Sequence, residues 1–171
     1  MEIYLDTEFT DFAVDSALIS IGFVSVDGKE FYAELNDTYC EDKCSDFVIE
    51  NVLPILNGKA VEISWNDLAP KLKTWIESFD EPATLWADGI EFDWAWIIEI
   101  FSNSKCGWPG NMARGCNSTG NLAADEQQER YYRAYEDFWL ENQARGAVQH
   151  HALWDARCIL HAHQQAVGAQ G

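Results

Sequence analysis

The sequence is poor in basic residues, with 11 lysines and arginines against 29 acidic residues and a formal net charge of −18. Because proteins usually bind nucleic acids through lysine and arginine, this total charge argues against a nucleic-acid partner. The charge is uneven, since residues 1–104 hold five lysines and 22 acidic residues and every arginine follows them. An anionic ligand would therefore contact the C-terminal third. The alternative is that the acidity maintains solubility and the arginines are ordinary surface residues.

Long hydrophobic runs and an N-terminal leader pattern are also lacking. No window approaches about 18 consecutive apolar residues, and no basic segment followed by an apolar one opens the chain. We therefore expect a cytoplasmic protein without a membrane span. The five cysteines are an odd number without a secretory context, which favours free thiols, and their spacings are not those of the usual zinc sites.

The length of 171 residues predicts a single domain over residues 1–171. Asp27-Gly28 joins two β-rich runs and indicates a hairpin, so the chain is expected to begin with an antiparallel meander. The strands are predicted at 2–9, 17–26, 29–35 and 83–88, the helices at 46–56, 65–79, 91–101, 124–143 and 150–166, and a loop at 105–123. This order predicts a mixed α/β fold with a central mixed sheet flanked by helices.

The first predicted strand carries two acidic residues, Asp6 and Glu8, in the run YLDTEF. Residues i and i+2 of a strand point to the same face, so the two carboxylates project together. A first strand beside two apolar strands is normally central, and carboxylates buried there repel each other unless a cation or hydrogen-bond donors compensate. Divalent cations prefer carboxylate oxygens. The pair therefore indicates either a metal site or a solvated strand face.

Further chemistry-bearing residues follow along the chain. Asp93 falls in the opening turns of the helix predicted over 91–101, although Asp88 at the end of the preceding strand competes with it. His150 and Asp155 stand five residues apart at the entrance to the last helix. An acidic residue near a helix N-terminus is often only a favourable partner of the helix dipole. The ordered combination of D-x-E, F-D and H-x4-D is more specific than any of its parts.

These motifs give the chain a resemblance to a known family. LDTEF, WADGIEFDWAWI and HHALWDAR look like the motifs of the DEDDh class of 3′-5′ exonucleases, in the DnaQ-like, RNase H-like superfamily. Within that class the chain resembles the bacterial and phage exoribonuclease-like group, whose motifs read D-T-E-F and H-H-A-L-x-D-A-R. The resemblance implies an RNase H-like fold and a metal-dependent 3′-5′ exonuclease that acts on single-stranded nucleic acid, RNA in preference to DNA.

The resemblance also implies roles for individual residues. It makes Asp6, Glu8, Asp93 and Asp155 the ligands of two divalent cations, Mg²⁺ or Mn²⁺, with Asp6 shared between them. Its catalytic residues are these four acids and His150, the general base that takes a proton from the attacking water. Where relatives often carry an amide or an aliphatic stretch, this chain has Asp88, which stays an alternative metal-site acid. The residues expected to bind substrate are Phe9, Thr10 and Arg157.

Other readings of the sequence stay open. The chain can be a catalytically silent RNase H-like nucleic-acid-binding module, a DNA-directed 3′-5′ exonuclease, or an RNase H-type endonuclease, although the last normally takes its second acid from a helix. The expected partner is a single-stranded 3′ end of RNA or DNA, without a membrane, and a homodimer is a further expectation from the resemblance. Of the other histidines, His151, His161 and His163 are expected to be surface or packing residues.

Overall fold

A six-stranded mixed sheet forms the centre of the computed structural model, which describes residues 1–168. The last three residues of the domain expected over 1–171 lie outside the described residues. The sheet order is β4-β3-β2-β1-β5-β6, and β1–β2 and β2–β3 are its antiparallel pairs. The strands are β1 (Glu2–Phe9), β2 (Leu18–Ser25), β3 (Glu30–Leu35), β4 (Glu62–Ile63), β5 (Ala83–Ala87) and β6 (Met112–Ser118).

The predicted N-terminal meander is confirmed. Gly28 has a φ of 84° in the turn between β2 and β3, in the left-handed region that glycine enters without steric cost. β2 is buried along its whole length and lies between β1 and β3. β1 lies between β2 and β5, so the strand that carries Asp6 and Glu8 is central, as the sequence predicts.

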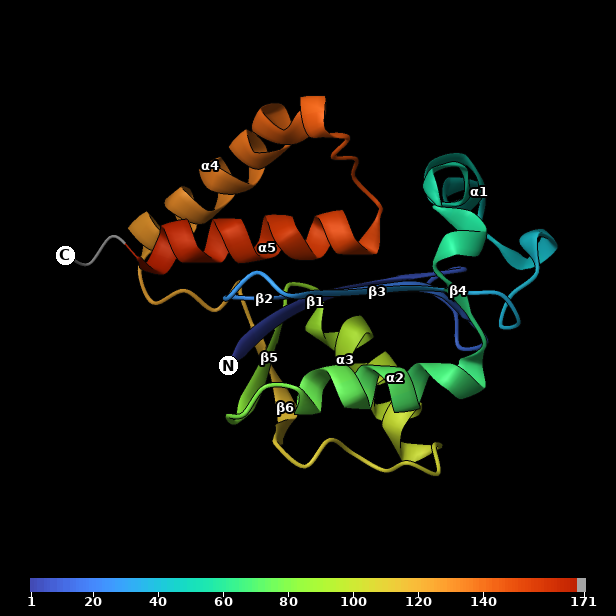
Figure 1. The fold of residues 1–171 in the computed structure, drawn as a ribbon. Coiled ribbons are helices and arrows are strands. Elements are labelled where there is room, and N and C mark those ends of the chain that lie inside the picture. Colours follow the sequence, from blue (N-terminus) through green and yellow to red (C-terminus); the bar gives the residue numbers. More distant parts are fainter. Residues whose placement is uncertain (169–171) are drawn as a thin grey trace.

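Helices cover both faces of this sheet (Figure 1). α2 (Trp65–Glu77) and α3 (Ile90–Ser102) lie on one face, whereas α4 (Asp125–Asn142) and α5 (Ala152–Val167) lie on the other. The short α1 (Asp46–Asn51) lies on the same side as α5, near its N-terminal end. The predicted mixed α/β fold with a helix-flanked sheet is therefore confirmed.

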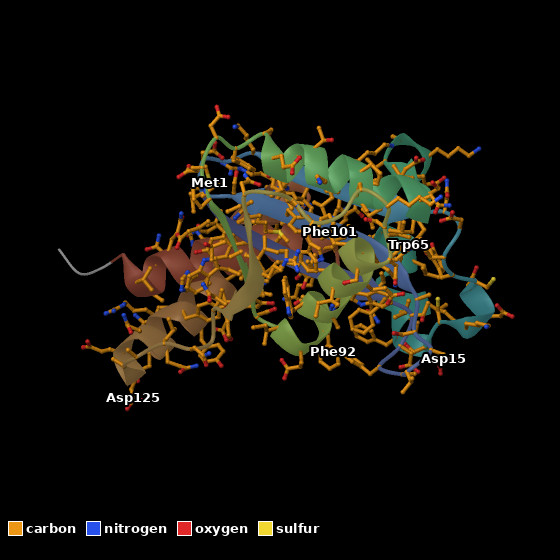
Figure 2. The ribbon with its side chains drawn as sticks, turned by 90° about the horizontal axis from the view of Figure 1, so that it is seen from below. Met1, Asp15, Trp65, Phe92, Phe101 and Asp125 are labelled. Carbon is orange, nitrogen blue, oxygen red and sulfur yellow. The ribbon has the colours of Figure 1, made fainter. Side chains whose placement is uncertain are left out.

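The main hydrophobic core lies between the sheet and α2 and α3, the side from which Figure 2 views the molecule. Ile3 and Leu5 of β1 are fully buried in it, because alternate residues of the strand point to this face. Tyr4 points to the opposite face and joins a smaller apolar cluster with Ala156 and Ile159 of α5. The two faces of β1 are thus buried against different layers.

The predicted loop over residues 105–123 is wrong in part, because β6 occupies Met112–Ser118. This segment is rich in small polar residues and has little β-propensity, so its extended form comes from parallel pairing with β5. The predicted helix over 46–56 is also divided. α1 ends at Asn51 and a separate 3₁₀ turn covers Leu53–Ile55, because Pro54 has no backbone N–H for an α-helical hydrogen bond.

Candidate active site

The acidic residues of β1 lie on the face that α5 covers. Asp6 and Glu8 follow Tyr4 at alternate positions, and both side chains are half-buried. On the neighbouring strand, Gly22 stands directly opposite Asp6. A β-carbon at Gly22 would lie 2.4 Å from the backbone carbon of Ala152, so the first turn of α5 packs directly on the backbone of β2. The glycine therefore allows α5 to approach the two carboxylates closely.

Asp155 lies in the first turn of α5, above Asp6 and Glu8. Its Oδ2 accepts a hydrogen bond of 2.8 Å from the backbone amide of His151, the residue that caps this helix. A carboxylate is favoured at a helix N-terminus by the helix dipole and by unpaired amides. Local helix chemistry thus fixes Asp155 at the end of α5 nearest the acids of β1.

The remaining acids reach the same place from β5 and α3. β1 and β5 are parallel, so their carboxyl ends meet at one edge of the sheet, where ligand sites in α/β folds usually form. Asp88 follows β5 directly, and Asp93 lies in the first turn of α3. Asp93 is only 3% exposed and accepts a hydrogen bond of 2.7 Å from Thr7 Oγ1 of β1. This bond brings α3 to the acidic end of β1.

The carboxylates form two clusters that share Asp6. One consists of Asp6, Glu8 and Asp155, and the other of Asp6, Asp88 and Asp93. Within each cluster, one oxygen of every residue lies within 4.8 Å of an oxygen of the others. The structure therefore brings together all four acids predicted from the sequence, and it adds Asp88.

Burial and mutual repulsion dominate the electrostatics of these acids. Burial, followed by the charges of Asp155, Asp93, Glu8 and Asp88, holds the pKa of Asp6 well above its usual range. The same two causes raise the pKa of Glu8 to about 8. Burial raises the pKa values of Asp93 and Asp155 to about 7 each, against opposing hydrogen bonds from Thr7 and from the backbone of His151.

A cavity of about 540 Å³ opens over these clusters. None of the described residues that line it is a lysine or arginine, so the protein offers no positive side chain there to balance the acids. Oxygen ligands in this number and spacing suit Mg²⁺ or Mn²⁺, which are hard cations. The donor set therefore fits the pair of divalent cations expected from the sequence.

His150 lines the same cavity, in the loop that precedes α5. Its backbone φ of 65° lies in the left-handed region, where histidine is found more often than most residues. The imidazole packs edge-to-face on Phe47 of α1, with ring centroids 4.8 Å apart. Burial lowers the pKa of His150, which favours the neutral ring at neutral pH. The structure thus places an imidazole in the cavity that the acids line.

His151 is a packing residue, as expected, but it belongs to a polar network that the sequence did not reveal. It is 5% exposed, and its ring stacks on Tyr32 with centroids 4.5 Å apart. Its Nε2 lies 3.1 Å from Asn57 Nδ2. Buried Glu34 accepts hydrogen bonds from the Tyr32 hydroxyl and from the backbone amide of Asn57. Tyr32 and Glu34 point to the same face of β3 because side chains alternate along a strand. Their contacts to residues 57 and 151 depend on the tertiary fold.

The structure places the three residues expected to bind substrate in different surroundings. Phe9 lines the acidic cavity. Thr10 is 3% exposed, and its hydroxyl accepts a hydrogen bond from the Ala17 amide within its own loop. The structure does not bring Arg157 to the cavity, because its guanidinium donates two hydrogen bonds to Glu30 at 2.6 and 2.7 Å.

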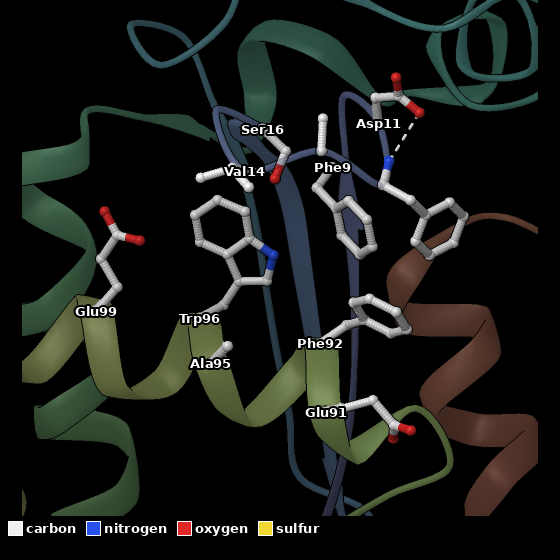
Figure 3. A pocket seen from close by; sticks show the side chains of 11 residues that line it. Phe9, Asp11, Val14, Ser16, Glu91, Phe92, Ala95, Trp96 and Glu99 are labelled. Atoms are coloured by element: carbon white, nitrogen blue, oxygen red, sulfur yellow. Dashed lines mark hydrogen bonds between the residues drawn. The ribbon is translucent and has the colours of Figure 1, made fainter.

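A second cavity of about 370 Å³ adjoins the acidic one and shares Phe9, Phe12 and Phe92 with it. Figure 3 shows Phe9, Phe92 and Trp96 gathered on one side of α3. The rings touch one another, with centroids 5.0 Å apart for Phe12 and Phe92 and 5.2 Å for Phe9 and Phe12. Phe12 is 77% exposed. The acidic site is therefore bordered by an accessible aromatic surface.

Together, the mixed sheet, its flanking helices and the carboxylates at the end of its central strand are consistent with an RNase H-like α/β fold. Residues 1–167 match the model of the family described as a 3′-5′ exoribonuclease Rv2179c-like domain, and the chain belongs to that family. The description indicates a hydrolase and supports the exoribonuclease class expected from the sequence. A search of the curated proteins found no match. Within residues 1–168, no helix is both long and apolar enough to cross a membrane.

Proposed function

We propose that this protein is a metal-dependent 3′-5′ exonuclease that removes nucleotides from single-stranded RNA. The observation that carries this proposal is the pair of carboxylate clusters sharing Asp6, in a chain that belongs to an exoribonuclease family. Both clusters open into one cavity, so a single phosphodiester can meet all of these groups. The intact set of acids argues against a silent binding module.

The metal ligands in this proposal are Asp6, Glu8, Asp93 and Asp155. Asp6 belongs to both clusters and is therefore the shared ligand, with Glu8 and Asp155 on one side and Asp93 on the other. Two bound divalent cations would activate the attacking water and neutralise charge on the phosphoryl group and on the leaving oxygen. The hydrogen bonds from Thr7 to Asp93 and from His151 to Asp155 orient these two carboxylates.

His150 acts as the general base. The neutral imidazole that burial favours accepts a proton from the water that attacks the phosphorus of the terminal nucleotide. The bond from this phosphorus to the 3′ oxygen of the preceding nucleotide breaks, and that oxygen leaves with a proton as a new 3′ hydroxyl. The products are a nucleoside 5′-monophosphate and an RNA shortened by one nucleotide. Phe47 supports the ring of His150 during this transfer.

Substrate binding relies on aromatic surface more than on basic residues. Phe9, Phe12 and Phe92 border the acidic cavity, and aromatic faces stack on every base, which suits an enzyme without sequence preference. Thr10 supports the loop that carries Phe12, next to Phe9 at the end of β1, through its bond to Ala17. Arg157 is committed to Glu30, so a phosphate contact there requires that ion pair to open.

The test uses RNA and DNA oligonucleotides of the same sequence, labelled at the 5′ end, with a free or a blocked 3′ hydroxyl. Each is incubated with Mn²⁺, Mg²⁺ or a chelator and with the wild type, Asp6→Asn or Glu129→Gln. Glu129 is an exposed acid of α4 and lines neither the acidic nor the aromatic cavity, so it is a matched control. We expect stepwise shortening of RNA from a free 3′ end, with metal, by the wild type and Glu129→Gln.

Three outcomes would contradict the proposal in different ways. Shortening that persists with chelator or in Asp6→Asn excludes the metal mechanism at these acids. Faster shortening of DNA than of RNA assigns a DNA-directed exonuclease. RNA binding without any shortening assigns a binding module.

A further inference from the structure

Asp88 is the one acid of the two clusters that the proposed catalytic set does not use. It lies within 4.8 Å, oxygen to oxygen, of both Asp6 and Asp93. Without Asp88, one cluster has three carboxylates and the other has only Asp6 and Asp93. With Asp88, each cluster has three, and Asp6 is common to both.

The fold places Asp88 at this position through backbone pairing. Ala87, the last residue of β5, accepts a hydrogen bond of 3.0 Å from the Thr119 amide on one side, and β5 runs parallel to β1 on the other. Asp88 is the next residue, so it leaves the sheet at the edge where Asp6 also lies. The backbone position of Asp88 follows from strand register, and its exposed side chain lines the acidic cavity.

The contacts of Asp88 leave its negative charge without a balancing cation from the protein. The Gly89 amide donates one hydrogen bond of 2.7 Å to Oδ1. Among residues 1–168, no lysine or arginine pairs with Asp88. After burial, the charge of Asp88 is one of the causes that raise the pKa values of Asp6, Asp93 and Asp155. Asp88 therefore influences the ionisation of the other acids of the site.

We propose that Asp88 is a fifth carboxylate ligand, which gives the cation between Asp6 and Asp93 a third protein oxygen donor. This inference rests on the proposed function, because it assumes that the clusters bind cations. A third carboxylate holds the second cation more tightly, so both positions fill at lower metal concentration than two carboxylates would allow. It also makes the two cation positions similar in ligand number.

The test measures Mn²⁺ binding by calorimetry, without substrate, for the wild type, Asp88→Asn and Glu129→Gln. Asparagine keeps the size of the side chain and the hydrogen bond from Gly89 while it removes the charge. We expect two bound Mn²⁺ in the wild type and in Glu129→Gln. In Asp88→Asn one binding event stays unchanged, and the other weakens about tenfold or more. Electron paramagnetic resonance detects the magnetic coupling between two bound Mn²⁺ ions. In Asp88→Asn this coupled signal should be absent at Mn²⁺ concentrations at which the wild type shows it.

Thermal unfolding of the same variants supplies a second readout and confirms that they fold. Asp88→Asn should raise the unfolding temperature of the metal-free protein, because one repulsive charge is gone, and should reduce the further rise that Mn²⁺ produces. If Asp88→Asn and Asp88→Ala bind both cations as the wild type does, the assignment of Asp88 is overturned and the proposed function stands. If the wild type binds no Mn²⁺, both proposals fail.

Discussion

The two faces of the central sheet bury different chemistry. The face under α2 and α3 is mainly apolar, and Leu72 and Ile97 of these helices are fully buried in it. At its end, Thr7 donates the hydrogen bond that holds Asp93 of α3. The face under α5 buries Glu34 and His151 and carries Asp6, Glu8 and Asp155 of the candidate site. The apolar part of the first face stabilises the fold and contributes no ligand to the site. The second opposes folding until cations balance its charges, so stability and function should respond separately to changes on each face.

The largest effect of a single substitution on stability is expected from the apolar face. Leu72→Ala removes a fully buried side chain from the main core and should lower the free energy of unfolding by about 2–5 kcal/mol. Urea denaturation measures this change, and calorimetry should find Mn²⁺ affinity at the wild-type value in the folded variant. A large loss of Mn²⁺ affinity would show that the two faces are coupled.

A second effect on stability is expected from pH on the acidic face. In the metal-free protein the pKa of Glu8 is raised to about 8 and that of Asp155 to about 7, so the folded state keeps protons that the unfolded chain releases. Stability is then greatest below the ordinary carboxyl pKa and is lost as pH rises through the raised values. Between about pH 5 and 8 it should fall by about 1.4 kcal/mol per pH unit for each extra proton held.

Urea denaturation in chelator measures this slope, and Asp6→Asn should flatten it because the shared charge is gone. Saturating Mn²⁺ should weaken or reverse the dependence, since the cations favour ionised carboxylates. Metal-free stability that rises with pH would contradict the repulsion described for this face.

The smallest of these effects on stability is expected from Gly22→Ala. The added methyl group meets the backbone of Ala152 at 2.4 Å, so α5 must move away from β2. Overpacking of this kind costs about 1–3 kcal/mol. The displaced helix carries Asp155. We therefore expect a large loss of exonuclease activity and of Mn²⁺ affinity, although the loss of stability is moderate. Gly120→Ala is a matched control, since a β-carbon there meets only Ser118 Oγ at 3.6 Å. Equal activity in the two variants would contradict the role of the close approach.

Much of this architecture could be predicted from local patterns. Asp27-Gly28 defines the hairpin, and the period of two places Asp6 and Glu8 on one face of β1. The motif order also selects Asp93 and Asp155, which the structure brings to Asp6. Local patterns suffice here because strand alternation and helix capping act over a few residues.

The parts that the sequence did not reveal depend on pairing between distant residues. β6 has a composition typical of a loop and becomes a strand only beside β5. Asp88 and Asp93 are alternatives in the sequence, whereas the parallel pairing of β1 with β5 brings both to Asp6. Arg157 is a plausible phosphate ligand by spacing, but its partner Glu30 is 127 positions away in the chain. No local pattern contains that information.

The left-handed backbone of His150 restricts which side chains position 150 can accept. At a φ of 65°, glycine, asparagine, aspartate and histidine are the residues that fit with little strain. Among these, only histidine has an ordinary pKa near neutrality. The backbone at position 150 and the proposed proton transfer thus favour the same residue. His150→Asn keeps the backbone and removes the proton acceptor, whereas a valine at this position would report backbone strain as well.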